Sequence, residues 1–180
     1  MFKKILALAL ASGFHSVGAK VLPHPLFQNG AVLQRDRSVP VWGSAAEGER
    51  VEVSLDGQVV STLARDGKWR VDLAPHPAGG PFVLSIRGNN SIELQNVMVG
   101  DVYLCSGQSN MEWTVDISAE KNELLAEPAD PQLRLFLVDH QIADSPRDRP
   151  LNKAGWNCPR GEFSAVAYAL CAVARVSPSG

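Results

Sequence analysis

A serine lies just behind a short apolar run near the middle of this sequence, in the stretch 102–113, which reads VYLCSGQSNMEW. The run 102–105 lacks a strict alternation of apolar and polar residues, which is typical of a strand buried on both faces of a parallel sheet. Gly107 then allows a tight bend or the close approach of another group. A strand that ends in such a turn, with a helix behind it, presents a hydroxyl at the carboxyl edge of the sheet, where open α/β folds bind their ligands. Ser109 is the candidate for that hydroxyl, and nucleophilic attack on an acyl group is the chemistry it could perform.

Residue types alone also fit a simpler interpretation. A single serine after a glycine is most often an ordinary turn residue, and a short motif match carries a risk of being a false positive. The stretch is not the nucleophile elbow of α/β-hydrolases either. That motif requires a second glycine two residues after the serine, and Met111 occupies the position here. The residue types alone therefore do not distinguish between a turn residue and a nucleophile at Ser109.

The run Gly107-Gln108-Ser109-Asn110-Met111 resembles the first block of the SGNH hydrolases, in the form found in sialate O-acetylesterases. Residues 100–105 and 112–113 fit that family as well. The resemblance implies that Ser109 is the nucleophile of an ester hydrolase and that its own backbone N–H donates into the oxyanion hole. Gly107 and Gln108 would shape the turn, and Asn110 would orient the serine. The implied reaction removes an acetyl ester from a sialic acid through an acyl-serine intermediate, without a metal or an organic cofactor.

Composition narrows the class of protein further. The chain has 180 residues, of which 45% are hydrophobic and 20% charged, as in a soluble globular protein of one domain or of one domain and part of another. The formal net charge of -2 gives no electrostatic reason to expect nucleic acid as a partner.

Residues 1–19 have the three parts of an export signal: Lys3 and Lys4 at a positive start, an apolar core over 5–11, and small residues over 17–19 as a cleavage site. An amino-terminal membrane anchor is the alternative, but the apolar stretch is well short of the ~20 residues that span a bilayer. No later segment is long and apolar enough to do so. We therefore expect a protein exported to a periplasm or to the exterior, without membrane association once the signal is removed.

Thiol and imidazole side chains are few in this sequence. Cys105, Cys158 and Cys171 allow at most one internal disulfide, and their spacing leaves open which pair forms. Cys105 belongs to the predicted buried strand and is expected to be a small core residue rather than a reactive thiol. His24 and His76 stand beside prolines and are expected at turns or on the surface. Because there is no Cys-x-x-Cys pair or Cys/His cluster, we predict no metal site.

Residues 20–98 are predicted to form an antiparallel β-sandwich of the immunoglobulin or jelly-roll kind, and parts of 23–43 resemble the amino-terminal β domain of sialate O-acetylesterases. Short runs alternate apolar with polar residues, and Asp-Gly and similar pairs between them suit tight hairpins. The predicted strands are 39–42, 51–55, 59–62, 69–73, 82–86 and 92–97. The predicted core contains Trp42, Val51, Val53, Leu55, Trp69, Val71, Leu73, Val83, Leu84 and Ile86. Trp42 or Trp69 could instead bind a glycan, but a tryptophan in an alternating strand usually fills a core, so we assign no binding residue to this unit.

Residues 99–180 are predicted to be the first part of an SGNH-type three-layer α/β domain with a parallel sheet. A helix over 116–127 and a strand over 132–138 follow the serine, and the order strand, helix, strand predicts a βαβ unit. A polar loop over 139–153 and a buried helix over 163–175 complete the predicted elements.

The likeness to the family ends after Tyr168, and residues 169–180 are small and apolar. Later blocks of the family supply a glycine and an asparagine for the oxyanion hole and an Asp-x-x-His for the base, and this sequence contains none of them. Asp139 and His140 could substitute, although neighbouring side chains of an extended chain point in different directions. We therefore expect a truncated and inactive hydrolase domain, from a reading frame that is cut or frame-shifted after Tyr168, with 169–180 as unrelated sequence. Whether the chain is itself an enzyme stays open.

Two functions of different classes remain. The first is a serine esterase that acts on O-acetylated sialic acid or a related acetylated glycan. The second is a noncatalytic, exported glycan-binding or assembly module, in which the β-sandwich is the functional part and the serine block is vestigial.

Overall fold

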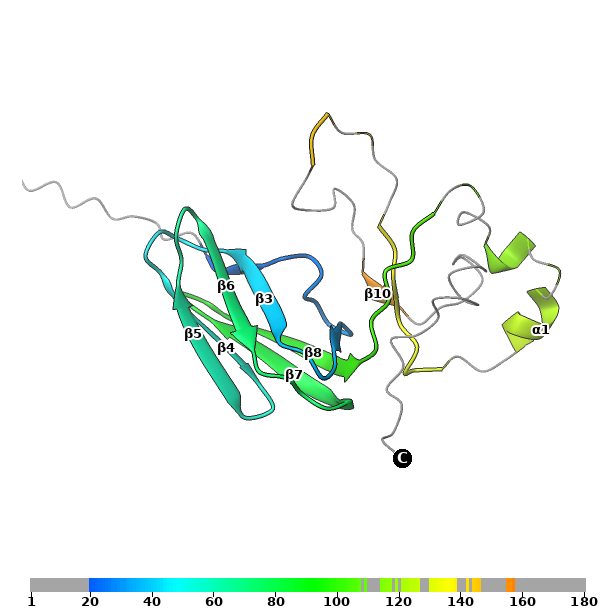
Figure 1. Ribbon diagram of the computed structural model, residues 1–180, viewed down its shortest axis with the longest axis horizontal. Helices are drawn as coiled ribbons and strands as arrows, with labels where there is room; N and C mark the ends of the chain where they lie inside the picture. The colour runs from blue at the N-terminus through cyan, green and yellow to red at the C-terminus, as the bar shows by residue number, and fades with distance from the viewer. Residues whose placement is uncertain are drawn as a thin grey trace, which may run out of the picture.

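Two β-sheets packed face to face dominate the structure, a computed structural model (Figure 1). It describes residues 20–107, 109, 114–117, 119, 121–126, 130–138, 142, 144–146 and 155–157. The three-stranded sheet has the order β1-β3-β6, formed by Leu22–Pro23, Val39–Ser44 and Lys68–Leu73. The five-stranded sheet has the order β2-β8-β7-β4-β5, formed by Val32–Gln34, Ser91–Gly100, Gly79–Arg87, Arg50–Leu55 and Gln58–Leu63. The prediction of a β-rich unit in this part of the chain is confirmed.

Two Asp-Gly turns close hairpins at the predicted positions. Asp56 and Gly57 have φ angles of 44° and 80°, and Asp66 and Gly67 have φ angles of 52° and 71°. Positive φ at both central residues matches the twist of the flanking strands, and aspartate and glycine tolerate it better than other residues. The first turn joins β4 to β5 within one sheet, and the second leads from β5 to β6 and so from one sheet to the other.

The hydrophobic core lies between the two sheets. In β6 the alternation is strict, because Trp69, Val71 and Leu73 are buried and the residues between them are exposed. Eight of the predicted core residues are buried as expected: Val51, Val53, Leu55, Trp69, Val71, Leu73, Leu84 and Ile86. The prediction missed contributions from the loop before β2 and from β8, including Ala31, Val97 and Val99, each 0% exposed.

Two predicted core residues are not in the core. Trp42 is only half-buried, because Val39 and Val41 point inward in β3 and the alternation places Trp42 on the outer face. Val83 is 44% exposed. A register shift between Phe82 and Leu84 changes which residues of β7 face inward, so that a simple period of two fails there.

One strand pair is parallel, which the prediction of a fully antiparallel sandwich did not include. β2 pairs with β8 in the register Val32 to Met98 and Gln34 to Gly100. The pairing brings the end of β8, and with it the start of the segment that leads to Ser109, beside β2.

The prediction of a buried strand over 102–105 is wrong. The structure has no strand at 101–107, and the side chains of Val102, Tyr103 and Leu104 are 39%, 57% and 95% exposed. A strand buried on both faces requires a neighbouring strand and covering layers on each side. The described residues beyond 100 contain only short elements, which provide neither.

The remaining elements are short. A 3₁₀-helix, Val115–Ile117, and the helix α1, Lys121–Ala126, occupy part of the predicted helix 116–127. The strand β9, Leu135–Phe136, is shorter than the predicted 132–138 and pairs antiparallel with β10, Trp156–Asn157. The described residues therefore contain no parallel βαβ unit, and the predicted α/β layers are not confirmed. The predicted helix over 163–175 lies outside the described residues.

Cys105 forms a disulfide, so the expectation of a small core thiol is wrong for this residue. The other two cysteines, Cys158 and Cys171, lie outside the described residues. None of the described helices has the length and hydrophobicity needed to cross a membrane.

Candidate functional site

Ser109 is exposed, as is Gly107 two residues before it. Gln108 and Asn110, the other two residues of the predicted site, lie outside the described residues. A nucleophile must be accessible to its substrate, but accessibility is equally typical of a turn serine. The exposure of Ser109 is therefore compatible with the predicted role, and the assignment of the four site residues stays a prediction.

The segment that leads to Ser109 is attached to the sandwich at its start. The Arg35 Nε donates to Asp101 Oδ1 at 2.9 Å, and the Val102 N–H donates to Gln34 Oε1 at 2.9 Å. The Arg35 N–H also donates to the Gly100 carbonyl at 2.9 Å, which extends the β2–β8 pairing by one bond. The hydrogen bond to Asp101 and the charge of that carboxylate raise the pKa of Arg35. The direction of the chain at 101–102 is thus fixed by β2.

A second attachment comes from Arg134, which is 7% exposed. Its guanidinium donates to the Gly30 carbonyl at 2.8 Å, to Asn96 Oδ1 at 2.9 Å and to the Pro131 carbonyl at 3.3 Å. Hydrogen bonds from a charged donor are stronger than neutral ones. Arg134 therefore ties the chain around β9 to the loop before β2 and to β8.

Trp156 supports the same contact from β10. Its indole N–H donates to the Leu26 carbonyl at 2.8 Å, and its ring lies 5.5 Å from that of Phe136 on β9. The indole also packs against the sandwich core. The sequence analysis missed both Arg134 and Trp156 as contact residues. The only sequence feature that could have indicated the contact of Arg134 is its position within the otherwise apolar run 133–138.

The predicted acid–base substitutes for Ser109 are Asp139 and His140, which lie outside the described residues. His24 begins a turn, as one of its two predicted positions required, because the Phe27 N–H donates to the His24 carbonyl at 2.8 Å. It is buried rather than at the surface, and its Nδ1 accepts a hydrogen bond from the Leu26 N–H at 3.2 Å. His76 bonds Asp56 Oδ2 at 2.9 Å. Both histidines therefore belong to the sandwich.

No cluster of three or more histidine, cysteine, aspartate or glutamate side chains that could hold a metal occurs among the described residues.

The fold is similar to that of part of a solved carbohydrate acetylesterase. The crystal structure of the enzyme from Xanthomonas citri superimposes with a TM-score of 0.79 at 37% sequence identity, over 83% of this chain and 36% of that chain. A likeness at this identity places the chain among relatives of carbohydrate acetylesterases. No family model matches the chain.

The particular relatives are sialate O-acetylesterases, and the resemblance to that family is confirmed. The protein from Homo sapiens is 38% identical over 155 residues, which are 78% of this chain and 30% of the relative. The protein from Mus musculus is 34% identical over 148 residues, 74% of this chain and 27% of the relative. The chain thus spans less than a third of the length of these relatives, which is consistent with a resemblance to their amino-terminal part only.

Proposed function

We propose that this chain belongs to an exported serine esterase of the SGNH class, with Ser109 as the nucleophile and O-acetylated sialic acid as the substrate. The observation that carries the proposal is the similarity to sialate O-acetylesterases over three quarters of the chain, which includes 34% identity with the mouse protein. The run 107–111 and the exposure of Ser109 support the choice of nucleophile.

The proposed reaction has two steps. The Ser109 Oγ attacks the carbonyl carbon of the acetyl ester, the bond to the sugar oxygen breaks, and the serine proton passes through a base to that oxygen. Water then attacks the acetyl-serine and gives a proton through the base to the Ser109 Oγ, the bond from that oxygen to the acetyl carbon breaks, and acetate leaves. The backbone N–H of Ser109 donates to the oxyanion in both steps.

The base must come from a residue other than Ser109. A serine hydroxyl without a neighbouring base is a poor nucleophile at neutral pH. The sequence contains no Asp-x-x-His, and each oxyanion donor that is missing lowers transition-state stabilisation by roughly 2.7–4 kcal/mol. We therefore propose that this chain by itself has little or no esterase activity.

A chimera tests the proposal without requiring activity from the chain alone. Residues 20–157 replace the aligned stretch of the Homo sapiens relative, and hydrolysis of an O-acetylated sialic acid is measured. We expect hydrolysis by the chimera and a loss of roughly ten-thousand-fold in kcat on Ser109→Ala, since removal of the nucleophile leaves only binding and oxyanion stabilisation. Ser106→Ala, at an exposed serine of the same segment, is the matched control and should change kcat by less than about threefold.

Two results would contradict the proposal. A folded chimera without activity would show that residues 20–157 do not carry the family's site, and a fully active Ser109→Ala chimera would exclude this serine as the nucleophile. The first result would favour the noncatalytic glycan-binding module, and the second would require another nucleophile. Export is tested separately, by determining whether the mature chain begins at residue 20 after expression with its leader.

A further inference from the structure

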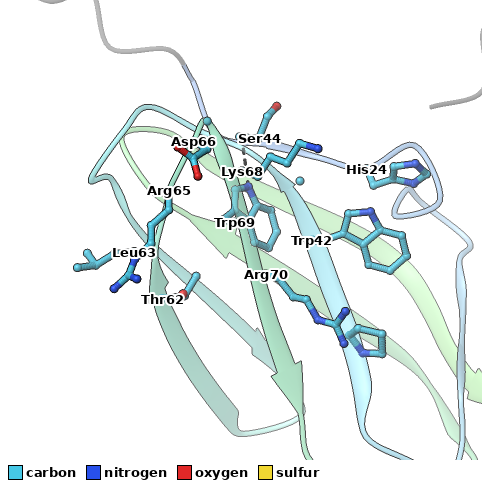
Figure 2. Close-up of a pocket in the computed structure, with 13 residues that line it drawn as sticks. His24, Trp42, Ser44, Thr62, Leu63, Arg65, Asp66, Lys68, Trp69 and Arg70 are labelled. Atoms are coloured by element: carbon cyan, nitrogen blue, oxygen red, sulfur yellow. Dashed lines mark hydrogen bonds between the residues drawn. The ribbon is translucent and has the colours of Figure 1, made fainter. Parts of the chain in front are cut away.

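A broad groove lies over the outer face of the three-stranded sheet, on β3 and β6 and beside the end of β5 (Figure 2). Strand pairing sets its floor, because Trp42 stands opposite Arg70 and Ser44 stands opposite Lys68. The residues between them in sequence point into the sandwich core, so these four point outward. The groove has a volume of about 1090 Å³. Sites for small organic ligands span roughly 300–1,000 Å³, so this groove has room for at least one sugar ring.

Trp42 is held in place at the floor of the groove. The ring of Phe27 meets its indole edge to face at 4.8 Å, and the ring of His24 lies 5.1 Å away. These contacts leave the indole half-buried, and the part that remains uncovered lines the groove. An aromatic face has a negative quadrupole, which attracts the weakly positive C–H groups on one side of a sugar ring. A tryptophan fixed before the ligand arrives binds with a smaller loss of side-chain entropy.

The charges along the groove are mostly positive. Arg65, Lys68 and Arg70 line it, against a single lining carboxylate, Asp66. At neutral pH the ionised side chains of this lining therefore sum to +2, or to +1 when Asp72, which is paired with Arg70, is counted with them. Such a surface complements an anion by its charge, an attraction that a neutral sugar would lack.

Arg70 is oriented for a further bond. Its Nη2 and Nε donate to Asp72 Oδ1 at 2.8 and 3.3 Å, which fixes the plane of the guanidinium. Within the described part of the chain its Nη1 has no hydrogen-bond partner. The fork of an arginine matches the two oxygens of a carboxylate, and Arg70 lies directly across from Trp42 in the strand register.

We propose that this groove binds a sugar that carries a carboxylate, with the ring on Trp42 and the carboxylate on Arg70. The choice of a sugar as ligand rests on the proposed function. The site itself uses none of the residues 102–113, and it would hold an acidic glycan on the sandwich while another part of the protein acts on it.

The test is a titration of the full chain carrying Ser109→Ala, which prevents turnover of any ester. The probes are N-acetylneuraminic acid and its methyl ester, which has the same ring without the charge. Binding is followed by the indole N–H signals of the four tryptophans in NMR. We expect the acid to bind with a Kd on the order of millimolar, and the methyl ester about tenfold more weakly.

Variants assign the two contacts. Arg70→Gln should weaken binding of the acid about tenfold and change that of the methyl ester by less than about twofold. Arg87→Gln, on the exposed face of β7 in the other sheet, is the matched control and should change neither. Trp42→Ala should weaken the binding of both probes about tenfold or more, and Trp42→Phe should restore part of the affinity. If Trp42→Ala fails to fold, Arg70→Gln alone tests the proposal. Arg70 is exposed on β6, so its substitution should leave the fold intact.

Equal affinity for the acid and its methyl ester would overturn the proposal, as would no saturation by about 50 mM of the acid. An unchanged affinity in folded Arg70→Gln would do the same. The result is independent of the esterase proposal: the titration reports the groove in a chain without the serine hydroxyl, whereas the chimera reports hydrolysis. Failure of one leaves the other standing.

Discussion

The inner faces of the sandwich strands and the segment 102–104 differ in how they place apolar side chains. In the sandwich, the apolar residues of β4, β6 and β7 are covered by a facing sheet, and Val53, Leu84 and Ile86 are 0% exposed. Beyond β8 a run of equally apolar residues lies on the surface, and Leu104 is 95% exposed. The difference lies in the covering layer, since hydrophobic stabilisation is proportional to the apolar area removed from water. An apolar run is buried only where the same unit supplies the side chains that cover it.

Two leucine substitutions should separate the regions most clearly. Leu84→Ala removes a fully buried side chain from the centre of the five-stranded sheet and should lower the free energy of unfolding by about 2–5 kcal/mol. Leu104→Ala is the matched control in the exposed segment and should change it by less than about 0.5 kcal/mol. Urea denaturation followed by circular dichroism measures both. A comparable destabilisation by the two substitutions would mean that the segment 102–104 is covered in solution.

The contact between the sandwich and the β9–β10 pair can be tested by a substitution of Arg134. Arg134→Met keeps much of the apolar stem but removes the donors to the Gly30 carbonyl and to Asn96. The loss should weaken the attachment of β9 and β10 by about 1–3 kcal/mol, because it removes hydrogen bonds made by a charged and buried donor. Hydrogen exchange of the Trp156 indole N–H should accelerate accordingly, while the amides of β4 and β7 stay protected.

Arg87→Met is the control for that measurement, because Arg87 lies exposed on β7. It should leave the exchange of Trp156 unchanged. The amides of β4 and β7 could instead lose protection together with Trp156 in Arg134→Met. The sandwich and the β9–β10 pair would then unfold as one cooperative unit.

Local sequence patterns predicted much of the sandwich. Period-two alternation identified β3 to β8 but neither β1 nor β2, and the Asp-Gly pairs identified two hairpins. Both signals act between residues close in sequence. Trp42 was misplaced because alternation defines two faces of a strand without saying which one is the core. In β3 the valines Val39 and Val41 take the inner face, and the tryptophan is left outside. With Trp42 assigned to the core, the sequence did not predict the groove on the outer face of β3 and β6.

Features that join distant parts of the chain could not be predicted in this way. The parallel pairing of β2 with β8 and the contacts of Arg134 with Gly30 and Asn96 link residues far apart in sequence. Nothing in the local pattern around Arg134 specifies its acceptors, since they are backbone and amide oxygens that any sequence could offer. For Ser109 the situation is the reverse: the motif 107–111 identified the candidate from sequence, and the structure adds its exposure.

The smallest effect expected is a dependence of sandwich stability on pH. The His76 side chain is 12% exposed; burial lowers its pKa, but the hydrogen bonds to Asp56 and to the Pro77 carbonyl outweigh burial, so the folded-state pKa is raised. A raised folded-state pKa means that protonation stabilises the folded state. The contribution is fully present below the unfolded pKa of about 6.5 and is lost as the pH rises through the higher folded-state pKa.

Asp56→Asn tests this assignment, because asparagine keeps the positive φ of the turn while the carboxylate charge is removed. Between pH 5.5 and pH 8.5 the wild-type chain should lose about 0.2–1 kcal/mol more stability than Asp56→Asn, the range of a solvent-exposed pair. In Asp66→Asn, at the same position of the other hairpin, stability should change with pH as it does in the wild-type chain. If all three chains had the same slope, the charge of Asp56 would not be what holds His76 protonated. The pH dependence would then have to arise from groups outside this hairpin.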